Sequence, residues 1–295
     1  MTYARVALVT GANKGIGLAL VECLSSRLGP GDLVLLTGRS AERVSAAVAL
    51  VAGSPATTSE IQGRVLDVSD ADAVAAMAAE LGDRYGGVDI VVSNASAMLT
   101  PDRPQSAQAE EFIGVANGGA HAVLRSFGPL LRPGGRLVVV ASSLGTLGHL
   151  DPRLRPLFDG ASLDEVEKAV ASWLSAIHAG TSEELGWPRW LNVPSKVAQV
   201  AAVRAVAAER RADDLPRDIL VAAVCPGLVD TPLSRPWFSD FSQARTPAQA
   251  AVPIVDLLLS APMNPEFHGE LVRSGHILPW PHGTPPRAQD LTLAP

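Results

Sequence analysis

The alternation of two kinds of segment constrains the fold of this chain more than any other feature. Short apolar runs, rich in β-branched residues, alternate with alanine-rich stretches of helical period. The runs lie at 5–9, 33–37, 64–67, 88–93, 136–141, 219–224 and 270–273, and the helical stretches at 18–28, 41–51, 71–81, 107–131, 194–211 and 247–259. Such alternation is typical of βαβ units, and unbroken apolar strands are typical of sheets buried on both faces. The sequence therefore predicts an α/β fold, a doubly wound parallel sheet with helices on both faces.

This rhythm breaks between residues 144 and 191. Loops rich in proline and glycine surround one amphipathic helix at 163–178 there,. We interpret residues 144–191 as a helical insertion before the next helix of a single Rossmann-like domain that spans 1–295. The proline-rich segment 277–295 is expected to wrap the surface or stay loose.

Composition excludes several classes of function. The 295 residues are 47% hydrophobic, enough for one large core, and the net charge of −6 gives no indication of a nucleic-acid partner,. The only two cysteines, Cys23 and Cys225, lie in apolar runs without ligand-like spacing, so we expect neither a disulfide framework nor a metal site,. No apolar stretch reaches the roughly 18 to 20 residues of a membrane span. We expect a cytoplasmic protein that acts on a small molecule.

A glycine-rich turn follows the first apolar run and opens the first helical stretch. It reads Thr10-Gly11-Ala12-Asn13-Lys14-Gly15-Ile16-Gly17. Glycines in such a turn let the backbone approach a pyrophosphate, which the helix N-terminus also attracts. The same turn can serve only strand-to-helix packing, but its position directly after the first strand favours a dinucleotide site.

Two cations point to the form of the dinucleotide. Arg39 ends the second strand, where a ribose of the cofactor would lie, and Lys14 lies in the glycine turn. NAD sites place a carboxylate there, whereas cations suit the 2′-phosphate of NADP(H). The alternative is that both are solvated surface cations. We therefore predict NADP(H) as the cofactor.

Further motifs carry a resemblance to a known family. The glycine turn resembles that of the short-chain dehydrogenase/reductase family, as do Asp67 after the third strand, Asn94 after the fourth, Asn117, Ser142-Ser143, Ser195-Lys196 and Cys225-Pro226-Gly227. The resemblance covers about residues 5–275. The long insertion, Gly186-Trp187-Pro188 and Gly269-Glu270-Leu271-Val272 are similar to the monomeric NADPH carbonyl reductases. A monomer is therefore expected.

The resemblance implies a role for each matching residue. Asp67 would meet the adenine ring and Asn94 the adenosine side of the pocket, while Lys196 would bind the nicotinamide ribose. Ser143 would hold the substrate oxygen, and Asn117 would anchor a water chain that ends at Lys196. The remaining cofactor contacts would come from Gly11, Asn13, Lys14, Gly15, Ile16, Gly17, Arg39, Pro226, Gly227, Val229 and Thr231.

One position departs from the family. Its acid is a tyrosine four residues before the lysine, and here that position holds Asn192. The only tyrosines are Tyr3 and Tyr85, far from this motif. An amide donates a hydrogen bond but cannot release a proton at neutral pH, and losing a general acid costs roughly 10²- to 10⁴-fold in rate. A quinone tolerates that loss better than a simple ketone, because its reduced oxygen is less basic.

Other roles for these residues stay open. Asn192 could be only a helix N-cap whose amide oxygen accepts the Ser195 N–H. His149 or His178 could replace the acid, although packing and surface roles are more common. Met98, Leu99 and three tryptophans could line a pocket for a flat ligand or simply pack: Trp173, Trp187 and Trp190.

Three functions compete at this point. The first is an NADPH-dependent reductase of an apolar or aromatic quinone or activated carbonyl, with Ser143, Asn117, Asn192 and Lys196 as catalytic residues. The second is a non-redox enzyme of natural-product biosynthesis, for an isomerisation, cyclisation or epimerisation. The third is a catalytically inactive NADP-binding protein, which the retained Ser143 and Lys196 disfavour.

Overall fold

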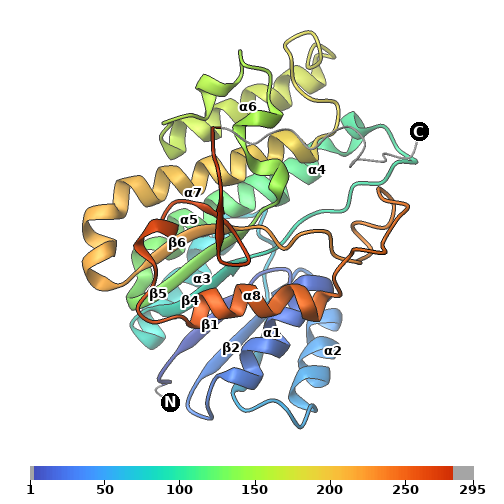
Figure 1. Ribbon diagram of the computed structural model, residues 1–295. Coiled ribbons are helices and arrows are strands. Elements are labelled where there is room, and N and C mark those ends of the chain that lie inside the picture. The colour runs from blue at the N-terminus through green and yellow to red at the C-terminus, as the bar shows by residue number, and fades with distance from the viewer. Residues whose placement is uncertain (1–2, 282–295) are drawn as a thin grey trace.

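The computed structural model describes residues 3–281, and an eight-stranded sheet forms their centre (Figure 1). The strands are β1 (Val6–Val9), β2 (Leu33–Gly38), β3 (Glu60–Val65), β4 (Val88–Ser93), β5 (Leu131–Val140), β6 (Leu220–Val224), β7 (Leu271–Arg273) and β8 (His276–Leu278). Their order is β3-β2-β1-β4-β5-β6-β7-β8, and all pairs are parallel except β7 with β8. The predicted doubly wound parallel sheet is confirmed.

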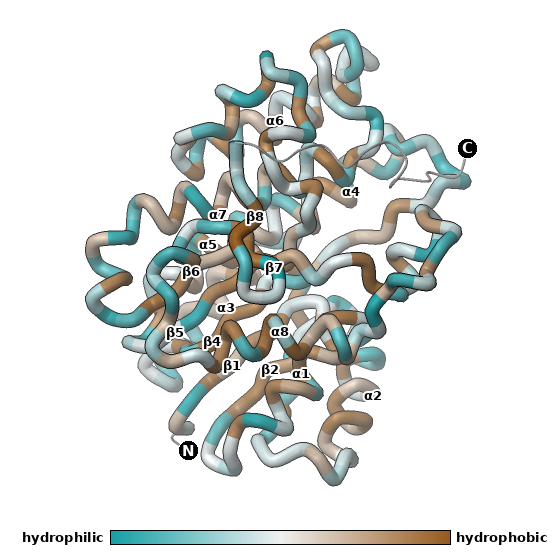
Figure 2. The backbone as a smooth tube through the Cα atoms, in the orientation of Figure 1, coloured by the Kyte–Doolittle hydropathy of each residue, from teal (hydrophilic) through white to brown (hydrophobic). Residues whose placement is uncertain are grey.

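Helices cover both faces of the sheet (Figure 1). One face carries α1 (Gly15–Arg27), α2 (Ala41–Ala52) and α8 (Pro247–Leu259), and the other carries α3 (Ala71–Tyr85), α5 (Gly119–Phe127) and α7 (Asn192–Asp214). Each face has its own apolar core, because the strand side chains alternate between the two,. Figure 2 shows the hydrophobic residues concentrated along the central strands and the inner sides of these helices.

The segment between β5 and α7 adds an outer helix, α6 (Leu163–His178), whose bounds equal the predicted ones. A capping box between Ser162 and Glu165 fixes its start,. Its buried side packs against α7 and α4 (Ala109–Ile113), with Trp173 stacked on Trp187 at 5.7 Å between ring centroids. The helix therefore covers part of the outer surface of α7 (Figure 1).

Besides shifted bounds, such as that of β5, which begins at Leu131 instead of 136, three predicted elements differ from the structure in kind or place. The third strand lies at Glu60–Val65 instead of 64–67, because this edge strand is polar and no apolar run marks it. The long helix predicted at 107–131 is interrupted by a π-helical turn, Gly114–Gly118, between α4 and α5. The predicted tail begins inside strand β8; its residues 282–295 lie outside the described part of the chain.

Trp280, just after β8, ties the end of the described chain to the insertion. Its indole nitrogen donates to Asp159 Oδ1 at 2.9 Å, and its carbonyl oxygen accepts from the Leu147 backbone at 3.1 Å. In residues 3–281, no helix combines the length and the apolar character required to cross a bilayer.

Candidate active site

The glycine turn lies at the edge of the sheet where the strand order reverses, between β1 and β4. Ligands of such sheets bind in the crevice at this switch point. Gly11 has φ +60°, and a Cβ there would lie 2.7 Å from the Ala95 Cα; a Cβ on Gly17 would lie 2.5 Å from Asn94 Nδ2. Both positions therefore need glycine, and the turn lies directly against the residues that follow β4.

Side-chain hydrogen bonds join this turn to the end of β4. Asn94 Nδ2 donates to the carbonyl oxygens of Thr10 and Gly11 at 3.0 and 3.2 Å. The Thr10 hydroxyl accepts from the backbone N–H groups of Asn94 and Ala95 at 2.9 and 3.1 Å. Asn94 therefore shapes the turn, and so does Thr10, a residue to which sequence reasoning gave no role.

The predicted adenosine side carries charges that fit an NADP(H) molecule. Lys14, which precedes the first residue of α1, is exposed, as is Arg39 after β2, whose only ion pair among the described residues is an exposed one with Glu111 at 3.1 Å. Hydrogen bonds from Ser69 to Asp67 Oδ1 lower the pKa of Asp67, so this carboxylate stays ionised near the end of β3. A Cβ on Gly38 would approach Asn13 Oδ1 to 3.2 Å. The glycine turn, two accessible cations and an acceptor thus lie along the ends of neighbouring strands.

The loop after β6 approaches the same turn. Pro226 and Thr231 are buried, and a Cβ on Gly15 would lie 3.8 Å from the Thr231 methyl group. Gly227 has φ +79°, and Val229 pairs as an isolated parallel bridge with Arg245. The structure therefore brings the predicted 226–231 segment to the N-terminus of α1.

The start of α7 corrects one interpretation of Asn192. This residue is the first of the helix, and the Ser195 N–H donates to the Leu191 carbonyl at 3.2 Å instead of to the Asn192 amide. A residue from a distant loop, Gln105, accepts from the Leu191 N–H at 2.8 Å. Asn192 as an N-cap is therefore wrong. Its half-buried amide makes no hydrogen bond to another described residue.

Lys196 lies one turn further along α7. Its Nζ donates to the Val140 carbonyl at 3.2 Å, at the end of β5, and to Gln199 Oε1 at 2.7 Å. Burial of the ammonium lowers the pKa of Lys196 to about 8, against a smaller opposite effect of Cys225. Gln199 was missed in the sequence, although its spacing of three residues from Lys196 places both on one face of the helix.

Asn117 lies in the π-helical turn and is fully buried. Its Nδ2 donates to the Ser195 carbonyl at 2.9 Å, so it contacts α7 directly. The neighbouring Ala116 carbonyl accepts from Gln199 Nε2 at 2.6 Å. The connection from this turn to Lys196 that the structure shows therefore runs through Gln199.

The two serines after β5 differ in environment. The Ser142 hydroxyl accepts from the Leu144 N–H at 3.2 Å, whereas Ser143 is exposed. Two residues on, a Cβ at Gly145 would lie 2.9 Å from the Lys196 carbonyl oxygen. The short turn that carries Ser143 thus packs directly on the helix that carries Lys196.

The histidines and aromatic residues lie as follows. His149 Nδ1 lies 3.0 Å from the Thr146 hydroxyl, and burial lowers the pKa of His149, while His178 is exposed at the end of α6. Trp190 is buried against Trp237 of the loop after β6, with 5.7 Å between ring centroids. Trp237 in turn donates to the Leu99 carbonyl at 3.1 Å. This aromatic contact joins the start of α7 to the loops after β4 and β6.

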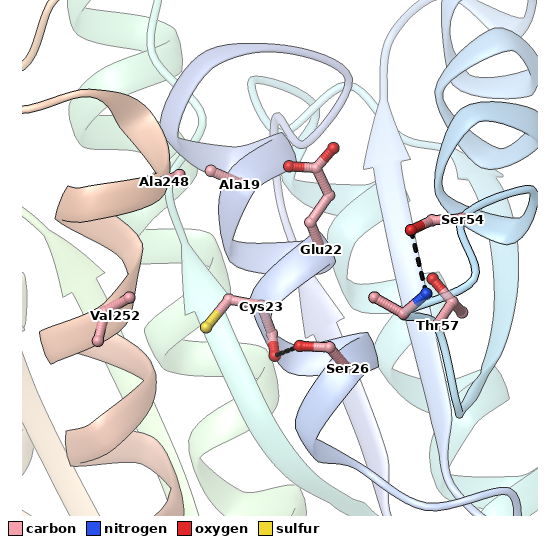
Figure 3. Close-up of a pocket in the computed structure, with 9 residues that line it drawn as sticks. Ala19, Glu22, Cys23, Ser26, Ser54, Thr57, Ala248 and Val252 are labelled. Atoms are coloured by element: carbon pink, nitrogen blue, oxygen red, sulfur yellow. Dashed lines mark hydrogen bonds between the residues drawn. The ribbon is translucent and has the colours of Figure 1, made fainter.

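A pocket of about 270 Å³ lies elsewhere, between α1, α8 and the 54–57 loop (Figure 3). The Cys23 thiol points toward α8 there, and the Ser26 hydroxyl donates to the Cys23 carbonyl at 3.0 Å. None of the predicted site residues lines this pocket. We therefore place the candidate active site at the strand ends and not here.

Comparison with known proteins agrees with this geometry. Residues 5–150 match the family described as short chain dehydrogenase. The chain is 32% identical over 285 residues to carbonyl reductase 1 (NADPH) of Oryctolagus cuniculus, covering 94% of this chain and 98% of the relative. It is 31% identical over 282 residues to the Homo sapiens protein of that name, covering 93% and 98%.

A solved structure shares the fold. Salutaridine reductase from Papaver somniferum superposes with a TM-score of 0.76 at 24% identity, over 90% of this chain and 99% of that one. The full-length relatives, the sheet order and the glycine turn at its switch point agree with the motifs described above. This chain belongs to the short-chain dehydrogenase family.

Proposed function

We propose that the protein is an NADPH-dependent reductase of quinones or activated carbonyl compounds. The observation that carries this proposal is the pairing of a dinucleotide-type glycine turn with a hydrogen-bonded Lys196 at neighbouring strand ends. Similarity to NADPH carbonyl reductases over nearly the whole chain supports the reaction class and the cofactor.

The chain's own residues account for cofactor binding. The glycine turn and the first N–H groups of α1 would hold the pyrophosphate, Asp67 the adenine, and Lys14 with Arg39 the 2′-phosphate. Lys196 and the 226–231 loop would hold the nicotinamide end. When bound, NADPH supplies a hydride.

The substrate side explains why the acceptor should be activated. Ser143 and the free amide of Asn192 can hydrogen-bond the reacting oxygen, but neither side chain gives up a proton readily at neutral pH. A quinone or strongly polarised carbonyl yields a less basic oxygen on reduction and depends less on an acid. The Trp190–Trp237 contact at the start of α7 suits an apolar or aromatic substrate,.

We also propose that the protein is a monomer. Helix α6 packs on α7, and Arg125 of α5 forms ion pairs with Asp164 and Glu167 of α6 at 2.8 and 2.9 Å. The insertion thus occupies helix surfaces that flank the active site and through which a second copy could pair. Light scattering at micromolar concentration should give the monomer mass; a stable tetramer contradicts this assignment.

The direct test of the function is consumption of NADPH. We expect loss of the nicotinamide absorbance with a panel of quinones, and we expect Asn192→Ala to retain that activity within about tenfold, since one neutral hydrogen bond contributes roughly 1 kcal/mol. If no quinone or carbonyl consumes NADPH while a bound natural product is isomerised or cyclised, the reductase function is wrong.

A further inference from the structure

We propose that Gln199 positions Lys196 so that the lysine ammonium itself gives the proton to the reduced oxygen of the substrate. The proposal rests on the reductase function above and names the acid that this function lacks. Its basis is a hydrogen-bonded chain of three members that the structure shows, Lys196, Gln199 and the Ala116 carbonyl.

Gln199 is fixed at both ends of its amide. Its Oε1 accepts from Lys196 Nζ at 2.7 Å, its Nε2 donates to the Ala116 carbonyl at 2.6 Å, and the residue is 3% exposed. Rotating the amide by half a turn would place its NH₂ group against the ammonium and its oxygen against another carbonyl oxygen. The acceptor end of Gln199 therefore stays directed at Lys196.

This arrangement leaves one N–H of Lys196 without a protein partner among the described residues, and we place it between the nicotinamide ribose and the reduced oxygen of the substrate. Of the three N–H groups of the ammonium, one donates to Gln199 and one to the Val140 carbonyl,. Asn192 lies one helical turn before Lys196, so the two residues lie on the same face of α7,. The Asn192 side chain makes no hydrogen bond to another residue within 3–281, so its amide is available to a substrate oxygen.

The proton transfer balances without any further reactant. Once the carbonyl carbon has accepted the hydride, its oxygen carries the electron pair of the former double bond. An N–H bond of the Lys196 ammonium breaks as the O–H bond forms, which leaves a neutral amine, and the amine then takes a proton from water. Gln199 stabilises the ammonium form without competing for its proton, because an amide is not a base at neutral pH.

The first test measures Lys196 directly, in the protein without cofactor. The chain has only three lysines, Lys14, Lys168 and Lys196, so a sample labelled with ¹³C at lysine Cε gives three signals to follow against pH. We expect Gln199→Glu to raise the pKa of Lys196 by about one unit or more, because a carboxylate favours the ammonium, and Gln199→Leu to lower it. Lys14 and Lys168 are internal controls and should not move. A Lys196 signal that titrates identically in all three proteins overturns the positioning role of Gln199.

The second test asks whether that proton is used. The rate of quinone reduction at saturating substrate should fall as pH rises through the Lys196 pKa. This alkaline limb should move upward in Gln199→Glu and downward in Gln199→Leu, in step with the NMR titration. If the variants are active and the alkaline limb of the pH–rate profile stays in place while the Lys196 signal shifts, the proton-donor role is overturned. If no acceptor is reduced, the reductase function fails and the donor role with it, while the spectra still decide whether Gln199 controls Lys196.

Discussion

The cofactor side and the substrate side of the candidate active site differ in how tightly the surrounding fold constrains their residues. On the cofactor side, Gly11 and Gly17 stand where any Cβ would collide with residues after β4, and Asn94 is bound to the carbonyls of Thr10 and Gly11. On the predicted substrate side, the Asn192 side chain contributes no hydrogen bond to the described fold. We therefore expect a change at Gly17 to disturb the fold and a change at position 192 to act mainly on the proposed substrate side. The proposed cofactor side tolerates less variation than the proposed substrate side.

Removing the Lys196 ammonium should have the largest effect, and it should act on the rate of quinone reduction. We expect Lys196→Met to lower the rate of quinone reduction at saturating substrate by about 10²-fold, the lower end of the range for loss of an acid, because a quinone depends less on one than a ketone does. Lys168→Met is the matched control, because Lys168 is an exposed residue of α6. A Lys196→Met enzyme as active as the Lys168→Met enzyme contradicts the role of Lys196.

Acid should lower the stability of the fold through the buried His121. Burial, with a smaller effect of Arg125, lowers the pKa of His121 in α5 from 6.5 to about 4, where its Nδ1 lies 3.9 Å from Glu167 of α6. Below pH 6.5 the unfolded chain therefore binds a proton at His121 that the folded chain binds only near pH 4. The stabilising contribution of the neutral His121 is complete above pH 6.5 and is lost as the pH falls toward 4,.

The size of this effect follows from the same pKa difference. It corresponds to roughly 3 kcal/mol of unfolding free energy between pH 7 and 4. Urea unfolding of His121→Leu should show a correspondingly flatter pH dependence than the unmodified protein, with the contributions of the other histidines unchanged. Parallel curves for the two proteins would mean that His121 takes up no proton on unfolding in this range.

Substitution of Arg39 should change the preference for NADPH over NADH, by a smaller factor than the effects above. We expect the protein to bind NADPH at least about tenfold more tightly than NADH, and Arg39→Ala to remove most of that preference, because a charge-assisted contact to the 2′-phosphate is lost. Fluorescence titration with both cofactors measures it. Arg27→Ala serves as the control, since Arg27 ends α1 at the opposite end from the glycine turn. An equal preference for NADPH over NADH in the Arg39→Ala and Arg27→Ala proteins would show that Arg39 does not bind the 2′-phosphate.

The sequence predicted those parts of the molecule that local patterns encode. Helix α6 was predicted to the residue, because its amphipathic pattern begins at a capping box and ends before a glycine. Strand β3 was displaced, because at the sheet edge its side chains are partly exposed and its sequence is polar. The glycine turn was found because its residues are neighbours in the chain.

Contacts between distant segments set the limit of prediction at the site. Gln105 accepts from Leu191 at the start of α7 from 86 residues away, a contact that no local pattern could predict, and the N-cap role that the sequence left open for Asn192 is not realised. Gln199 donates a hydrogen bond to the carbonyl of Ala116, which lies 83 residues away in a π-helical turn that no local sequence pattern predicted. Both depend on how α4 and α5 pack against α7, which the order of residues does not reveal.

The proposed reductase lacks a tyrosine acid, so we expect it to select substrates whose reduced oxygen needs little help from one. The most direct measurement is the ratio of kcat/KM for a quinone to that for a simple aliphatic ketone, with NADPH, in the unmodified protein and in Asn192→Tyr. We expect a large ratio in the first, and a smaller one in the second because the new phenol, one turn from Lys196, raises the rate with the ketone. Equal rates with both substrates in the unmodified protein, or reduction of neither, would contradict the claim.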